Sequence, residues 1–146
     1  LYDTIEETRK AARLSAEVTH NHEEGIKGAE ATASAIFLGR NGGSKEEIKA
    51  YIEKEFGYDL SRSLSSIRPF YSFDGSCQGT VPESIMCFLE GESTEDTIRN
   101  AISLGGDADT MGAIAGSIAE AYWKEDLSLL VKPYLPDDIY STLSRI

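Results

Sequence analysis

The sequence predicts a single all-α domain. Three observations support this prediction: apolar residues recur at helical spacing, capping residues precede several of these stretches, and glycines follow them. The 146 residues suffice for one compact core, and no internal repeat, low-complexity tract or linker divides them. We therefore expect one helical domain over residues 1–146.

The first two predicted helices cover residues 4–18 and 25–38. A capping-box pair, Thr4 and Glu7, begins the first helix. Its candidates for burial are the apolar residues Ile5, Ala12 and Ala16. The second helix carries many small residues, which favours close packing on several of its sides.

The middle of the chain contains one clear helix and one irregular region. Ser44 and Glu47 form a second capping box, and Gly57 stands where a C-cap glycine ends the helix. The chain is least regular from there to residue 79, with a short helix expected over residues 60–67 and extended backbone over residues 69–73.

Four further helices are predicted in the second half of the chain. The first begins at Thr80, with Pro82 in its first turn, and the next begins at Ser93. Glycines follow both of these helices. The expected ranges of the four are residues 80–90, 93–104, 110–123 and 136–146.

The composition excludes several functions. The sequence contains 14 Lys and Arg residues and 25 Asp and Glu residues, which gives a net charge of −11. This charge disfavours binding to nucleic acid or to an anionic membrane. No apolar run approaches the length of a transmembrane helix, and the N-terminus lacks a signal pattern. Two cysteines, Cys77 and Cys87, do not form a disulfide framework, so we expect a cytoplasmic location.

An acidic stretch, Ser103–Gly116, carries the main functional signal. Asp107, Asp109 and Thr110 lie between a glycine pair and a run of small residues that begins a helix. One Asp at this place is explained by N-capping and by the helix dipole. A second carboxylate two residues away adds repulsion in an anionic chain. A hard cation such as Mg²⁺, Ca²⁺ or Mn²⁺ relieves that repulsion.

Other aspartate motifs do not fit this stretch. An EF-hand loop that starts at Asp107 places Met111 and Ile118 at ligand positions, where oxygen atoms are required. A phosphotransferase loop follows a buried strand, whereas residues 98–104 have helical spacing. Two histidines and two cysteines without Cys-x-x-Cys spacing do not form a zinc site.

Three segments together resemble the ADP-ribosylglycohydrolase family, which includes the dinitrogenase reductase-activating glycohydrolase. The first is Gly105-Gly-Asp-Ala-Asp-Thr110 with the small-residue helix that follows it. The second is Thr19-His20 followed by Gly25-Ile-Lys-Gly28, and the third is Cys77-Gln-Gly-Thr-Val-Pro82. The resemblance extends over most of residues 4–123.

The resemblance implies an all-α orthogonal helical bundle with a dinuclear Mg²⁺ or Mn²⁺ site. Such enzymes cleave the glycosidic link between ADP-ribose and a protein side chain or small acceptor. Asp107 and Asp109 then correspond to catalytic metal ligands, and Thr110 to a further oxygen ligand. His20 corresponds to the histidine of the ribose pocket, with Gly106 and Gly79 at the border of the substrate site.

One departure from the family pattern limits this interpretation. The other metal-binding acids of the family lie in a Thr-Asp-Asp element of its N-terminal half, and this sequence contains none; Asp137-Asp138 lies at the wrong end. The chain therefore resembles a C-terminal half that needs a missing segment or partner chain. The alternative is a catalytically silent member, structural like the jellyfish crystallins of the family or binding ADP-ribose.

Overall fold

The computed structural model describes residues 2–145, apart from the side chain of Leu129. Within this range every regular element is a helix, which confirms the all-α prediction. The elements are α1 (Ile5–Glu17), α2 (Glu23–Arg40), α3 (Lys45–Phe56), α4 (Leu64–Ile67), α5 (Cys77–Glu90), α6 (Thr94–Leu104), α7 (Ala108–Trp123), α8 (Ser128–Val131), η1 (Lys132–Tyr134) and α9 (Asp137–Leu143).

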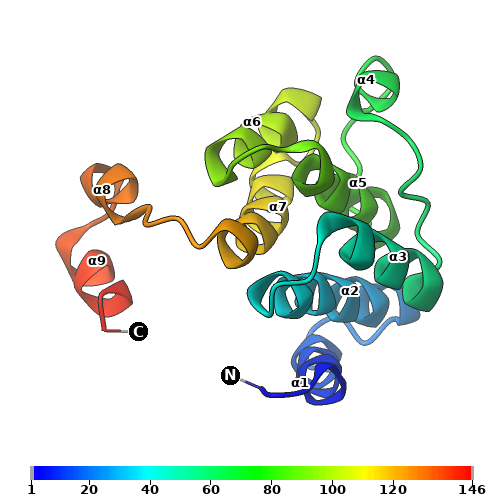
Figure 1. Ribbon diagram of the computed structural model, residues 1–146, viewed down its shortest axis with the longest axis horizontal. Helices are drawn as coiled ribbons and strands as arrows, with labels where there is room; N and C mark the ends of the chain where they lie inside the picture. Colours follow the sequence, from blue (N-terminus) through cyan, green and yellow to red (C-terminus); the bar gives the residue numbers. More distant parts are fainter. Residues whose placement is uncertain (1, 146) are drawn as a thin grey trace.

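Three helices, α2, α5 and α7, pack against one another and form the centre of the molecule. The other long helices cover this centre: α1 and α3 pack against α2, and α6 packs against α5 and α7 (Figure 1). Helices α8 and α9 lie to one side, beyond a connection that leaves the end of α7 (Figure 1). Helix α7, which begins with the acidic stretch, therefore packs against α2, α5 and α6.

Small residues allow α2 to approach its neighbours closely. A Cβ atom added at Gly28 would lie 3.1 Å from the Cβ of Cys77 and 3.2 Å from a methyl group of Val81 on α5. Ala31 and Ser34 are fully buried on the same helix. This confirms that the small residues of α2 serve close packing, which increases dispersion contacts across the interface.

The core continues from α3 through α5 to α7. Its fully buried large side chains include Ile48, Ile52, Ile85, Phe88, Met111 and Ile118. Burial of one such side chain contributes about 1.5–3 kcal/mol. At one end of this core, Phe88 lies edge-on to Tyr122 and Trp123, with ring centroids 5.3 and 5.6 Å away. These two aromatic residues therefore belong to the packing of α5 on α7.

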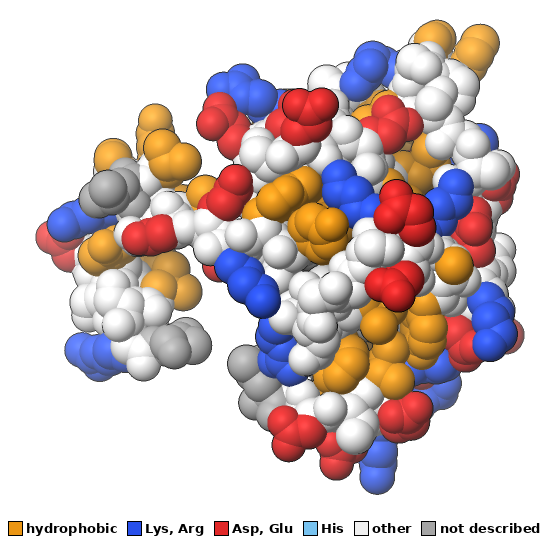
Figure 2. Space-filling model, in the orientation of Figure 1, with side chains coloured by type: hydrophobic (Ala, Val, Ile, Leu, Met, Phe, Trp, Pro, Cys, Tyr) orange, Lys and Arg blue, Asp and Glu red, His pale blue; other side chains and the backbone are white. Residues whose placement is uncertain are grey.

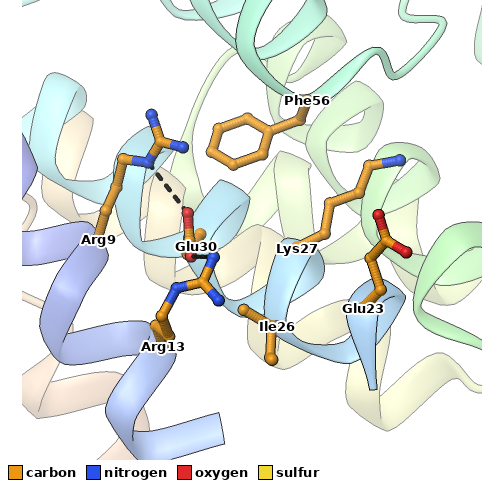
Figure 3. A pocket seen from close by; sticks show the side chains of 7 residues that line it. All are labelled: Arg9, Arg13, Glu23, Ile26, Lys27, Glu30 and Phe56. Atoms are coloured by element: carbon orange, nitrogen blue, oxygen red, sulfur yellow. Dashed lines mark hydrogen bonds and ion pairs between the residues drawn. The ribbon is translucent and has the colours of Figure 1, made fainter. Parts of the chain in front are cut away.

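Ion pairs hold α1 on the bundle (Figure 3). No residue of α1 is buried, so the expected burial of Ile5, Ala12 and Ala16 is wrong: all three are half-buried. Instead, the buried Glu30 of α2 accepts a hydrogen bond from Arg9 Nε at 3.1 Å and forms an ion pair with Arg13 Nη2 at 2.7 Å. Arg9 also pairs with Glu55 of α3.

Several helix boundaries differ from the sequence-based ranges. Helix α5 begins at Cys77, because the Ser76 side chain accepts from the Gly79 N–H one turn before Thr80. Pro82 therefore lies inside the helix rather than in its first turn. The short helix α4 covers only Leu64–Ile67, and a turn over residues 68–70 includes the first two residues of the segment 69–73 that was expected to be extended.

The C-terminal region leaves the bundle at Lys124, whose φ of 55° is left-handed. The last predicted helix is shorter than expected, because α9 covers Asp137–Leu143; Ile146 lies outside the described residues. Helix α8 and the turn η1 were not predicted. Among the described helices, none combines the length and apolar character needed to cross a bilayer. Figure 2 shows acidic and basic side chains interspersed on the face in view.

Candidate functional site: the aspartate loop

The connection between α6 and α7 turns sharply on two glycines. Gly105 has φ 75° and Gly106 has φ 64°, values that glycine adopts without the steric cost of a Cβ atom. Asp107 follows with φ −82° and ψ 66° as the N-cap residue of α7. We call Gly105–Thr110 the aspartate loop; it brings Asp107, Asp109 and Thr110 to the N-terminal end of α7.

Asp107 does not cap the helix that it precedes. Its side chain makes no capping hydrogen bond, unlike the N-cap residues of α1, α2, α3, α5 and α6. Capping therefore does not account for this carboxylate. The helix begins at Ala108 rather than near Thr110, so Asp109 lies within its first turn.

The two carboxyl groups of the aspartate loop interact. The neighbouring Asp107 side chain lowers the pKa of Asp109 below its usual range, and the backbone N–H groups of Thr110 and Asp109 lower it further. Among the described residues, neither carboxylate forms an ion pair with a Lys, Arg or His. Both charges therefore lack a cationic partner here.

The donor set suits a hard divalent cation but is small. Asp107 is half-buried, and Asp109 and Thr110 are exposed, so their oxygen atoms are accessible from solvent. Carboxylate and hydroxyl oxygens are ligands that Mg²⁺ accepts. Over residues 2–145, however, no group of three or more His, Cys, Asp or Glu side chains converges as a metal cluster. The loop thus offers part of a coordination shell.

Tyr71 joins Gly79 and Gly106, the two glycines expected at the border of the site. Its hydroxyl donates to the Gly79 carbonyl at 3.1 Å. A Cβ atom added at Gly106 would lie 2.7 Å from Cε1 of the Tyr71 ring. Burial raises the pKa of Tyr71, so the hydroxyl keeps its proton and remains a donor. Sequence reasoning missed Tyr71, because an aromatic residue in an irregular segment carries no periodic signal.

His20 lines a groove whose lining does not include the aspartate loop. It is exposed, and its Nδ1 lies 2.7 Å from Oγ1 of Thr19. It lines a groove of about 500 Å³ together with Cys77, Val81 and Ile114. The groove reaches α7 one turn beyond Thr110, but no side chain of Asp107, Asp109 or Thr110 lines it. The structure therefore does not join His20 to the aspartate loop in one pocket.

His22 has a structural role. Its Nδ1 accepts from the Glu24 N–H, so it is the N-cap residue of α2. Of the two histidines, only His20 thus lines the groove described above.

The cavity around Glu30 is not a second site of this kind. It has a volume of about 460 Å³ and is lined by Arg9, Arg13, Glu23, Ile26, Lys27, Glu30 and Phe56 (Figure 3). The guanidinium groups of Arg9 and Arg13 are satisfied by Glu30, and Lys27 pairs with Glu24 at 3.5 Å. These charges compensate one another and connect α1 to α2.

The family model for the ADP-ribosylglycohydrolases matches residues 1–140. The chain belongs to the ADP-ribosylglycohydrolase family. It is 28% identical to the ADP-ribosylhydrolase ARH3 of Homo sapiens over 86% of this chain and 47% of that protein. It is also 28% identical to ARH3 of Bos taurus, over 84% of this chain and 46% of that protein. It is 29% identical to ARH3 of Mus musculus, over 84% of this chain and 45% of that protein. The chain spans less than half the length of these relatives.

Proposed function

We propose that this chain supplies part of the dinuclear Mg²⁺ or Mn²⁺ site of a hydrolase. The enzyme cleaves the glycosidic link between ADP-ribose and a protein side chain or small acceptor. The observation that carries this proposal is the pair of carboxylates two residues apart, Asp107 and Asp109, that form no ion pair with a cation among the described residues. Membership of the ADP-ribosylglycohydrolase family supports the reaction class.

Each residue of the aspartate loop has a role in this proposal. Asp107 and Asp109 offer carboxylate oxygens, and Thr110 offers a hydroxyl oxygen, as ligands for the metal ions. Metal ions held by these residues would supply Lewis-acid polarisation of the ribose hydroxyls and of a water molecule for hydrolysis at the anomeric carbon. Gly106, whose side-chain position is filled by the Tyr71 ring, borders the substrate through its backbone beside the two acids.

The substrate and the remaining ligands are also part of the proposal. His20 donates a hydrogen bond to the ribose, and the backbone around Gly79 borders the bound substrate. The missing metal ligands come from an N-terminal segment or partner chain that corresponds to the rest of the relatives' length. The substrate is an ADP-ribosylated protein or a small ADP-ribose conjugate, and the enzyme acts in the cytoplasm.

Mn²⁺ binding tests the proposal, because the paramagnetic ion is detected directly. We expect the complete polypeptide, which supplies the remaining ligands, to bind Mn²⁺, and Asp107→Asn or Asp109→Asn to weaken binding at least about 100-fold, the upper range for loss of a residue that supports a metal site. ADP-ribose should then tighten Mn²⁺ binding. Asp126→Asn is the control, because this exposed carboxylate only accepts from the Ser128 N–H. Equal affinity in all variants would refute the metal site.

A second candidate function follows from the small number of acidic ligands. No cluster of three or more metal-binding side chains forms within residues 2–145. A catalytically silent protein, with a structural role or with affinity for ADP-ribose alone, agrees with that observation. The two candidates differ in hydrolysis: release of ADP-ribose from a modified peptide by the complete polypeptide supports the enzyme, and binding without release supports the silent protein.

A further inference from the structure

The aspartate loop has few restraints of its own. Gly105 and Gly106 are the residues with the greatest backbone freedom, and both have positive φ. No atom lies within 4 Å of a Cβ added at Gly105, and Asp107 makes no capping hydrogen bond. Asp107 and Asp109 follow this turn. To hold one conformation as metal ligands, they need a contact from another part of the chain.

Tyr71 provides that contact from the segment between α4 and α5. Its Cε1 and Cδ1 atoms would lie 2.7 and 3.4 Å from a Cβ at Gly106, so the ring fills the space of the missing side chain. The carbonyl oxygen of Ser72 would lie 3.4 Å from the same Cβ. The backbone of Gly106 is therefore packed against Tyr71 and the residue that follows it.

The ring of Tyr71 is itself fixed in place. Its hydroxyl bonds to the Gly79 carbonyl in the first turn of α5, and its ring packs against the core cluster. The same turn of α5 is tied to the segment before it, because Thr80 Oγ1 donates to the Asp74 carbonyl at 2.8 Å. Tyr71 thus connects the buried helix α5 to the aspartate loop, which has few restraints of its own.

We propose that Tyr71 is a positioning residue, which holds Gly106 and thereby sets the places of the Asp107 and Asp109 carboxylates for metal binding. This inference rests on the proposed function of the aspartate loop. The ring contact is the essential element, and the hydroxyl bond to Gly79 supports it.

Two substitutions separate the ring from the hydroxyl. Tyr71→Phe keeps the ring against Gly106 and removes only the bond to Gly79, whereas Tyr71→Leu removes the ring edge as well. We expect Mn²⁺ affinity to fall less than about 10-fold in the first variant and about 10-fold in the second, the lower end of the range found for residues that support metal ligands. Tyr51→Phe is the control. The Tyr51 hydroxyl, on α3, accepts from Arg9 of α1 and does not contact Gly106.

A double-mutant cycle tests the contact itself. In the unaltered protein, Gly106→Ala places a methyl group against the Tyr71 ring, and it also strains the backbone at φ 64°. The Tyr71→Leu background removes the collision but not the backbone strain. We therefore expect the two losses of Mn²⁺ affinity to be less than additive. Additive losses would mean that the ring does not touch Gly106 in solution.

Amide hydrogen exchange of residues 105–110, measured without metal, provides the second readout. We expect faster exchange in Tyr71→Leu, exchange close to the unaltered protein in Tyr71→Phe, and no change in Tyr51→Phe. Loop exchange and Mn²⁺ affinity that both stay unchanged in Tyr71→Leu would overturn the role of Tyr71. If the unaltered complete polypeptide binds no Mn²⁺, the proposed metal site fails, and with it the part of the inference that concerns metal binding.

Discussion

The carboxylate of Glu30 on α2 lies 2.7 Å from Nη2 of Arg13 on α1. The same carboxylate also accepts from Arg9, so one buried acid joins two cations of a helix that has no buried residue. Because α1 contributes little to the core, its attachment depends on this charged contact as well as on its half-buried face.

We predict that Glu30→Gln destabilises the protein by about 2 kcal/mol. Removing one partner of a buried ion pair costs about 3–5 kcal/mol, and the partly exposed guanidinium groups reduce that figure here. Urea unfolding measures the change in the free energy of unfolding. Glu95→Gln is the matched control, because its pair with Arg99 is exposed and contributes less than about 0.5 kcal/mol. Equal effects of the two substitutions would contradict the prediction.

Lys124→Gly is predicted to stabilise the protein. Lys124 ends α7 with φ 55°, a conformation in which an L-residue pays a steric cost at its Cβ atom, whereas glycine does not. The gain is about 0.5–1 kcal/mol, because the added freedom of glycine in the unfolded chain offsets part of it. Thermal unfolding provides the measurement. Lys124→Ala keeps the Cβ atom, so a similar gain in that variant would show that the backbone conformation is not responsible.

The two cysteines are predicted to react differently with a thiol reagent. Cys77 is half-buried, whereas burial raises the pKa of Cys87 to about 12 and encloses its sulfur completely. At about pH 8 we expect one thiol per folded chain to react and two per unfolded chain. Two reactive thiols in the folded protein would show that the core around α5 opens readily.

The same thiol makes stability depend on alkaline pH. Its pKa is raised on folding above the ordinary value of 9.0, so its contribution to stability is complete below about pH 9. That contribution is lost as the pH rises from there toward 12. Urea unfolding at increasing pH should therefore give a falling free energy of unfolding. A constant value between about pH 9 and 11 would contradict the burial of this group.

His20→Ala is predicted to weaken ADP-ribose binding about 10-fold, the effect of one lost hydrogen bond to the ligand. Mn²⁺ affinity should not change, because His20 lies in the groove with Cys77 and not in the aspartate loop. His22→Ala is the control: it removes the cap of α2 and costs about 1 kcal/mol of stability without a change in ligand affinity. Isothermal titration distinguishes these outcomes.

Local patterns in the sequence determined much of this protein. The capping box of Ser44 and Glu47, the C-cap at Gly57 and the cap at Ser93 all form as predicted, because each depends on residues within one turn. The glycine pair before Asp107 likewise predicts the turn of the aspartate loop. Two nearby acids also predict a cation site, because like charges at that spacing repel, and that site stays a prediction.

Only the tertiary structure decided which residues meet across the chain. Nothing in the pattern around Tyr71 indicates that its ring lies on Gly106, since 35 positions separate the two residues. Nor does helical spacing show that α1 is held by Glu30 rather than by buried Ile5, Ala12 and Ala16. Periodicity reports which face of a helix is apolar, whereas the partner of that face is set by packing between distant segments.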